Sequence, residues 1–182
     1  MDNLILLADL IKKRNTLETE IAKLIGRPAA IGHLGEYIAS TIFNIALEES
    51  ASRRAIDGRF RDGSVKGRSV NIKWYAMHEG LLDITPDLLP DYYLVLTGPR
   101  SLSMTSRGRA RPWLIEAVYL FDSRSLNDEL LARGVKRGVA CSVAKPLWNQ
   151  AEVYPNQKST GLVLSRDQRE QIMLFGTGPN DA

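Results

Sequence analysis

The sequence predicts a mixed α/β fold, in which a central sheet is flanked by helices and a long helix stands at the N-terminus. Three observations support this prediction. Apolar residues recur at helical spacing in two N-terminal segments, two short segments in the middle of the chain alternate apolar and polar residues, and two continuous apolar runs follow. Helical and strand patterns that follow one another along a single chain are typical of α/β domains.

Length and composition limit the class of protein. The 182 residues are enough for one sizeable core, so we expect one domain over residues 27–175, a separate helix at 1–26 and a flexible tail at 176–182. The single cysteine, Cys141, excludes an internal disulfide and a cysteine-based metal cage. We see neither a secretory signal nor a membrane span, and therefore expect a cytoplasmic protein without a membrane partner.

Residues 4–25 are predicted to form a long amphipathic helix that ends at Gly26. Five apolar residues share one face of this helix: Leu7, Leu10, Leu17, Ile21 and Leu24. Their spacing suits two interpretations, which are packing of the helix on its own domain and an antiparallel or coiled-coil contact with a second chain. The second interpretation predicts a homodimer through this helix.

A second helix is predicted over residues 33–47, because Leu34, Ile38, Ile42 and Ile45 form one apolar stripe. Small residues, Gly35 among them, would let this helix approach a sheet closely. The apolar runs at 92–97 and 113–121 predict strands, of which the first is covered on both faces.

Further elements are predicted toward the C-terminus. A helix begins at Ser125 and ends at Gly134. Residues 139–143 and 151–154 suit short strands. Ser165 with Gln168 resembles a capping box that begins a last helix.

The two alternating segments predict a hairpin. Ile56 and Phe60 on the first strand share their parity with the apolar residues of the second strand, Val70, Ile72 and Trp74. The opposite parity carries polar residues, namely Asp57, Arg59, Asn71 and Lys73. Because side chains alternate between the two faces of a strand, the hairpin places a carboxylate and a lysine away from the core.

The order of Glu36 in a helix, Asp57 on a strand and Asn71-Ile72-Lys73 on the next strand resembles the PD-(D/E)XK, or restriction-endonuclease-like, nuclease superfamily. The segments around Gly32-His33-Leu34-Gly35-Glu36 and Val70 to Trp74 also look like a family of uncharacterised bacterial proteins that is often assigned to this superfamily. The resemblance covers residues 27–121 and implies a restriction-endonuclease-like core.

The resemblance implies a site that hydrolyses phosphodiesters with Mg²⁺ or Mn²⁺. Asp57 would be the principal metal ligand, the backbone carbonyl of Ile72 a second, and Glu36 an outer or second-metal ligand. Lys73 would orient the attacking water or stabilise the transition state as a point charge. Asn71 departs from the superfamily pattern, which has Asp or Glu there, and an amide oxygen can ligate a metal without adding negative charge.

Each of these residues also has a structural interpretation. Asp57, before Gly58, would serve as a turn residue at the end of a strand, or form a surface ion pair with Arg59 or Lys73. Glu36 lies about opposite Leu34 on the helix, where solvent alone would explain a carboxylate.

Basic residues gather around the hairpin and in the loop between the two apolar runs. Arg59 and Arg61 lie beside Asp57, and the loop carries Arg107, Arg109 and Arg111 without an acid. Such clusters supply sequence-independent contacts to phosphates, so we expect these five arginines to bind nucleic acid, and DNA in particular. The sequence therefore predicts a metal-dependent DNA endonuclease. The alternative is an inactive nuclease-fold module that binds nucleic acid or a protein partner.

Overall fold

The computed structural model describes residues 2–48, 55–100 and 112–177. Its centre is a six-stranded sheet in the order β1-β2-β3-β5-β6-β8. The strands of this sheet are β1 (Ile45–Leu47), β2 (Gly58–Phe60), β3 (Ser69–Tyr75), β5 (Tyr92–Thr97), β6 (Ala117–Asp122) and β8 (Glu152–Tyr154). Among these described strands, β3 and β5 run parallel and the other neighbouring pairs are antiparallel. A small second sheet pairs β4 (Leu81–Leu82) with β7 (Cys141–Ser142).

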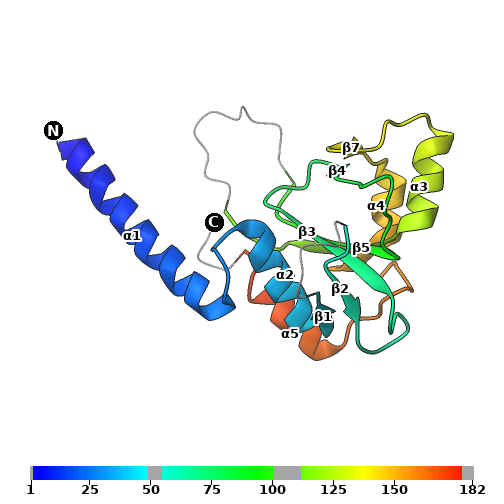
Figure 1. Cartoon of the computed structure of the whole chain (residues 1–182), viewed down its shortest axis with the longest axis horizontal. Helices are drawn as coiled ribbons and strands as arrows, with labels where there is room; N and C mark the ends of the chain where they lie inside the picture. Colours follow the sequence, from blue (N-terminus) through cyan, green and yellow to red (C-terminus); the bar gives the residue numbers. More distant parts are fainter. Residues whose placement is uncertain (1, 49–54, 101–111, 178–182) are drawn as a thin grey trace.

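Helices cover both faces of the sheet (Figure 1). One face packs against α2 (Ile31–Ile42) and α5 (Arg166–Met173), and the other packs against α3 (Ser123–Ala132) and α4 (Lys145–Ala151). The predicted class, a mixed α/β fold whose sheet is flanked by helices and preceded by a long helix, is confirmed.

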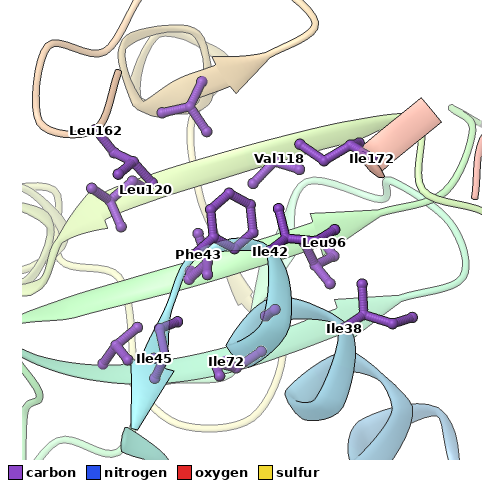
Figure 2. Close-up of a cluster of buried hydrophobic side chains, with 14 of the residues drawn as sticks. Ile38, Ile42, Phe43, Ile45, Ile72, Leu96, Val118, Leu120, Leu162 and Ile172 are labelled. Carbon is purple, nitrogen blue, oxygen red and sulfur yellow. The ribbon is translucent and has the colours of Figure 1, made fainter. Parts of the chain in front are cut away.

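Two buried clusters hold these layers together. In the first, Ile38, Ile42 and Phe43 pack against sheet residues that include Ile72 and Leu96 (Figure 2). In the second, Leu126, Leu130 and Trp148 pack against Tyr93, Val95, Tyr119 and Phe121. Consecutive residues of β5 enter opposite clusters, so the prediction of a strand covered on both faces is confirmed.

The predicted hairpin is present as β2 and β3, which pair antiparallel with Gly58 opposite Val70 and Arg59 opposite Ser69. The capping box is also confirmed, because the Ser165 hydroxyl accepts from the Gln168 N–H at 3.1 Å while the Gln168 side chain accepts from the Ser165 N–H at 2.9 Å.

Two predicted elements need correction, and one helix was not predicted. The second helix ends at Ile42, and residues 45–47 form β1, because Asn44 adopts φ 49° and the chain turns to pair with β2. The third helix begins at Ser123, since Asp122 and not Ser125 is its cap: the Ser125 N–H donates to the Asp122 carboxylate at 2.9 Å. Residues 145–151 form α4, which the sequence analysis did not predict.

The N-terminal helix α1 (Asp2–Ile25) extends away from the rest of the chain (Figure 1). Leu10, Leu17 and Leu24 are 51%, 59% and 73% exposed. Partial burial is confined to its C-terminal turns, from Glu18 onward, where it meets α2. The interpretation that the apolar face of this helix packs on its own domain is therefore wrong.

Candidate functional site

Asp57 stands where the two hairpin strands separate. Its N–H donates to the Val70 carbonyl at 2.9 Å, and the backbone pairing of β2 with β3 ends beside it, at Gly58 and Val70. The N–H of Ile72, the next residue of β3 that faces this edge, donates instead to Asp57 Oδ2 at 2.6 Å. The Asp57 side chain thus takes the place of a backbone acceptor, which fixes its carboxylate at the opening between the strands.

Gly58 permits this arrangement. A Cβ at Gly58 would lie 2.5 Å from the Ala46 carbonyl oxygen and 2.7 Å from Ile45 Cγ2, both on β1. A side-chain atom cannot approach backbone atoms this closely. The glycine at position 58 therefore allows β2 to pair with β1 directly after Asp57.

Glu36 is placed by a second close approach. A Cβ at Gly35 would lie 2.9 Å from Trp74 Cβ, so α2 crosses β3 at a distance that a larger residue would prevent. The prediction of small residues at this contact is confirmed for Gly35. The next residue, Glu36, is largely shielded from solvent, with 21% of its side chain exposed, and forms an ion pair with Arg27.

The charges of three elements act on the Asp57 carboxyl group. Burial raises its pKa, and the nearby Glu36 carboxylate raises it further, whereas the Ile72 hydrogen bond and the charges of Lys73 and Arg27 lower it, with a net rise above the usual value. Glu36 on α2 and Lys73 in the middle of β3 therefore both lie within electrostatic range of Asp57, which directly precedes β2. These are the three residues to which the sequence assigned catalysis.

Two further oxygen atoms belong to the candidate ligand set. In an extended strand the N–H and C=O of one residue point to the same edge, so the Ile72 carbonyl faces the side on which its N–H meets Asp57. Asn71 is 4% exposed, and its Oδ1 atom is buried without a hydrogen-bond partner. Within the described part of the chain, no three His, Cys, Asp or Glu side chains gather into a metal-binding group. A cation here would therefore rely on two carboxylates, backbone and amide oxygens, and water.

The structure describes two of the five arginines that were predicted to bind substrate. Arg59 is exposed on β2, where it donates to the Gly67 carbonyl at 3.2 Å and lies 3.8 Å from a Glu48 carboxylate oxygen. Arg61 is exposed just after the strand. Arg107, Arg109 and Arg111 lie outside the described residues.

Sequence reasoning missed Arg27. This residue precedes α2 by four positions, and its guanidinium reaches Glu36 only because the chain turns between the two helices. Its position between Gly26 and Pro28 could have indicated a role, because these residues mark the turn where the chain leaves α1 and enters the domain. His33 is structural, since its Nδ1 atom lies 2.9 Å from the Pro28 carbonyl oxygen.

No protein-family model matches this chain, and no curated protein matches it. Within the described residues, the helices are too short or too polar to cross a lipid bilayer.

Proposed function

We propose that this protein is a metal-dependent endonuclease that hydrolyses phosphodiester bonds in DNA, built on a restriction-endonuclease-like core. The observation that carries the proposal is that the charges of Glu36 and Lys73, which come from separate elements, both act on the Asp57 carboxyl group. The order of these elements also supports it: a helix with the first acid, a hairpin with the second acid and the lysine, and then an apolar strand parallel to the hairpin's second strand.

The donor set fits a hard divalent cation. Burial, and after it the nearby Glu36 carboxylate, raise the pKa of Asp57, and a bound cation would stabilise both carboxylates in their charged form. The orphaned Asn71 Oδ1 is a neutral oxygen of the kind that Mg²⁺ and Mn²⁺ accept as ligand. We therefore assign Asp57, Glu36, the Ile72 carbonyl and Asn71 to the cation.

Each residue would have a defined role in hydrolysis. A bound Mg²⁺ or Mn²⁺ neutralises phosphoryl oxygens and lowers the pKa of water. Asp57 is held in place by the Ile72 N–H, so its carboxylate needs little reorganisation to receive a charge. Lys73 supplies a positive charge beside Asp57, where it orients water or stabilises the negative charge that develops on the phosphoryl group.

Incubation of supercoiled plasmid with Mg²⁺ or Mn²⁺ tests the proposal. We expect nicking or linearisation by the wild type, and a loss of about a hundredfold or more in Asp57→Ala and in Lys73→Ala, because each removes a charge that acts in the transition state. Lys136→Ala, which removes an exposed lysine after α3, serves as the control and keeps full activity. Cleavage that survives both Asp57→Ala and Lys73→Ala contradicts the assignment.

The alternative function is binding without cleavage, and Asn71 is the observation that favours it, because an amide weakens the hold on a cation. In that case the wild type retards DNA in a gel without cutting it at any Mn²⁺ concentration. In either case we expect simultaneous neutralisation of Arg107, Arg109 and Arg111 to weaken DNA binding and flatten its salt dependence. Affinities that stay unchanged over a salt series contradict a role for this loop.

A second proposal concerns α1, whose exposed leucines favour self-association into a homodimer. A helix of 24 residues is about 36 Å long and offers a seam of apolar residues at heptad spacing. Isolated helices gain most of their stability by burying such a face. Because the described part of the domain leaves the leucines of this face exposed, a second copy of the same helix is the partner that matches its spacing.

The position of Arg14 favours an antiparallel pair. Arg14 occupies the seam midway between Leu7 and Ile21, so a parallel pair would oppose two arginines in the apolar interface. An antiparallel pair opposes Arg14 to Leu17 of the other copy. At the other positions of the seam apolar residues then face one another, with Leu7 opposite Leu24 and Leu10 opposite Ile21.

Flanking charges agree with the same register. The antiparallel arrangement brings Lys13 beside Glu20 of the other copy, and by symmetry this pair occurs twice. Light scattering on the full chain tests the idea. We expect a dimer for the wild type and for Asn15→Asp, which adds a charge outside the seam, and a monomer for Leu17→Asp. A monomeric wild type at micromolar concentration contradicts the proposal.

A further inference from the structure

A second polar cavity lies away from the hairpin. It measures about 350 Å³ and is bounded by the segment after β3, the end of β5, the start of β6, α4 and the segment around β8. The chain leaves β3 and β5 toward His78 and Arg100, respectively, and both residues line this cavity. Ligands of α/β sheets bind outside the carboxyl ends of parallel strands, and β3 and β5 are a parallel pair.

His78 presents a fixed hydrogen-bond donor to this cavity. The Gly80 N–H donates to His78 Nδ1 at 3.2 Å, so the neutral ring carries its proton on Nε2. Burial and the charge of Arg100 lower the pKa of the ring, which favours this neutral form. Trp148 and Tyr119 hold the ring, with centroids at 4.5 and 5.4 Å. The Nε2 atom is nevertheless buried without a partner.

Thr97 is a second orphaned group. The residue is 1% exposed and lines the cavity, and its buried hydroxyl group acts on the nearby Tyr119 hydroxyl but makes no hydrogen bond of standard geometry. Proteins seldom leave a buried hydroxyl unpaired, because the group has lost its bonds to water. Two such groups in the lining of one cavity indicate that a ligand atom completes their hydrogen bonds.

The charged side chains of the lining are two bases, Arg100 and Lys158, and two acids, Glu116 and Glu152. Glu152 is bound by Lys158 at 2.9 Å and by the side chain and backbone N–H of Asn156 at 2.8 and 3.2 Å. The Glu116 carboxylate accepts two hydrogen bonds from Thr177. Both acids are therefore engaged within the protein. Arg100 is exposed, and its charge reaches both His78 and Tyr119.

We propose that this cavity binds a phosphomonoester group, which accepts hydrogen bonds from His78 Nε2, the Thr97 hydroxyl and the Arg100 guanidinium. Arginine and neutral donors of this kind suit a phosphate, which carries close to two negative charges at pH 7. The cavity is larger than a bare phosphate ion, so it has room for a ligand that extends beyond that group. The phosphate belongs either to a small molecule or to the end of a nucleic-acid strand. The proposal does not rest on the cation site.

Calorimetric titration of the full chain with inorganic phosphate, in EDTA and at constant ionic strength, tests the proposal. We expect saturable binding that weakens about tenfold or more in Thr97→Val and in Arg100→Gln, since each variant loses one hydrogen bond to a charged group. Lys136→Gln changes the net charge as Arg100→Gln does and binds like the wild type. Thr97→Val replaces a hydroxyl by a methyl group of similar size, and Thr97→Ser, which keeps the hydroxyl, binds phosphate.

The source of the phosphate is tested with one oligonucleotide that carries either a 5′-phosphate or a 5′-hydroxyl group, again in EDTA. Tighter binding of the phosphorylated form, with a difference that disappears in Thr97→Val, identifies a strand end as the ligand. Equal binding of the two forms, together with Thr97-dependent phosphate binding, identifies a small phosphomonoester. Absence of phosphate binding by the wild type, or binding that persists in both Thr97→Val and Arg100→Gln, overturns the proposal. Because EDTA removes divalent cations, none of these results depends on nuclease activity.

Discussion

The hairpin site and the polar cavity show the same physical effect acting on opposite kinds of group. Burial disfavours charge in both places, so it raises the pKa of the Asp57 carboxyl group and lowers the pKa of the His78 ring. A bound cation would stabilise the charged Asp57 carboxylate, whereas a hydrogen-bond acceptor would pair with the N–H of the neutral His78 ring. The two regions therefore differ in the ligand that each is prepared to receive, although both lie beside β3.

The largest predicted effect comes from a substitution that disturbs the hairpin site and not the polar cavity. In Gly35→Ala the new Cβ meets Trp74 Cβ at 2.9 Å, so α2 must move from β3 and carry Glu36 with it. We expect a loss of about 1–2 kcal/mol in the free energy of unfolding, since overpacking outweighs the helix propensity of alanine.

Gly32→Ala, in the same helix, is the matched control for this change. No atom lies within 4 Å of the new Cβ, so alanine should stabilise the protein by about 0.5–1 kcal/mol. Urea denaturation measures both variants. A Gly35→Ala protein as stable as Gly32→Ala contradicts the close approach of α2 to β3.

The next prediction concerns Asp57 without metal. Because its folded pKa lies above the ordinary value of 3.8, the folded state holds the proton more tightly, and stability falls as pH rises from about 3.8 through the raised pKa. Asp57→Asn mimics the neutral form and should therefore be more stable than the wild type at pH 7 in EDTA. The difference should vanish near pH 3.5, and denaturation at several pH values measures it. A variant less stable than the wild type at pH 7 contradicts the predicted cost of this buried charge.

His78 should show the opposite pH dependence. Its folded pKa lies below the ordinary value of 6.5, so the unfolded state binds the proton more tightly and stability falls as pH drops below about 6.5. We expect His78→Gln to remove this loss between pH 6.5 and 5.5 while leaving the dependence at Asp57 in place. The same slope in both proteins would show that Arg100 and burial do not act on this ring as the structure indicates.

The smallest effect is expected at Arg27, whose guanidinium neutralises Glu36. Arg27→Gln removes a cation that competes with the metal, so Mn²⁺ should bind a few-fold more tightly than in the wild type. A competition titration with a coloured chelator measures the affinity. Weaker Mn²⁺ binding in Arg27→Gln would mean that Arg27 supports the site and does not compete with the cation.

Sequence patterns predicted the elements whose residues alone show a periodic or continuous apolar pattern. They failed for elements whose secondary structure depends on a partner that is distant in the sequence. The hairpin and β5 were predicted because their alternation or continuous apolarity spans several residues. β1 was mistaken for the end of a helix, since Ile45 continues the apolar stripe of α2 and pairing with β2 alone makes it a strand. The seven-residue α4 has no side-chain cap and is held by Trp148 in the core.

The two candidate sites also differ in whether the sequence could predict them. Glu36, Asp57 and Lys73 were proposed because they follow the order of a known motif along the chain, and in the structure the charges of Glu36 and Lys73 both act on Asp57. The cavity was not predicted, because His78, Thr97 and Arg100 form no motif and become notable only when their unpaired or charged groups meet around one space. Arg27 was missed because a tertiary turn brings it to Glu36.

The central claim is that Glu36 and Asp57 form one cation site, and electron paramagnetic resonance of Mn²⁺ tests it most directly. We expect one Mn²⁺ bound per chain, with an affinity at least about tenfold weaker in Asp57→Asn, reduced in Glu36→Gln and unchanged in His78→Gln. Equal Mn²⁺ affinity in the wild type and Asp57→Asn would contradict the claim.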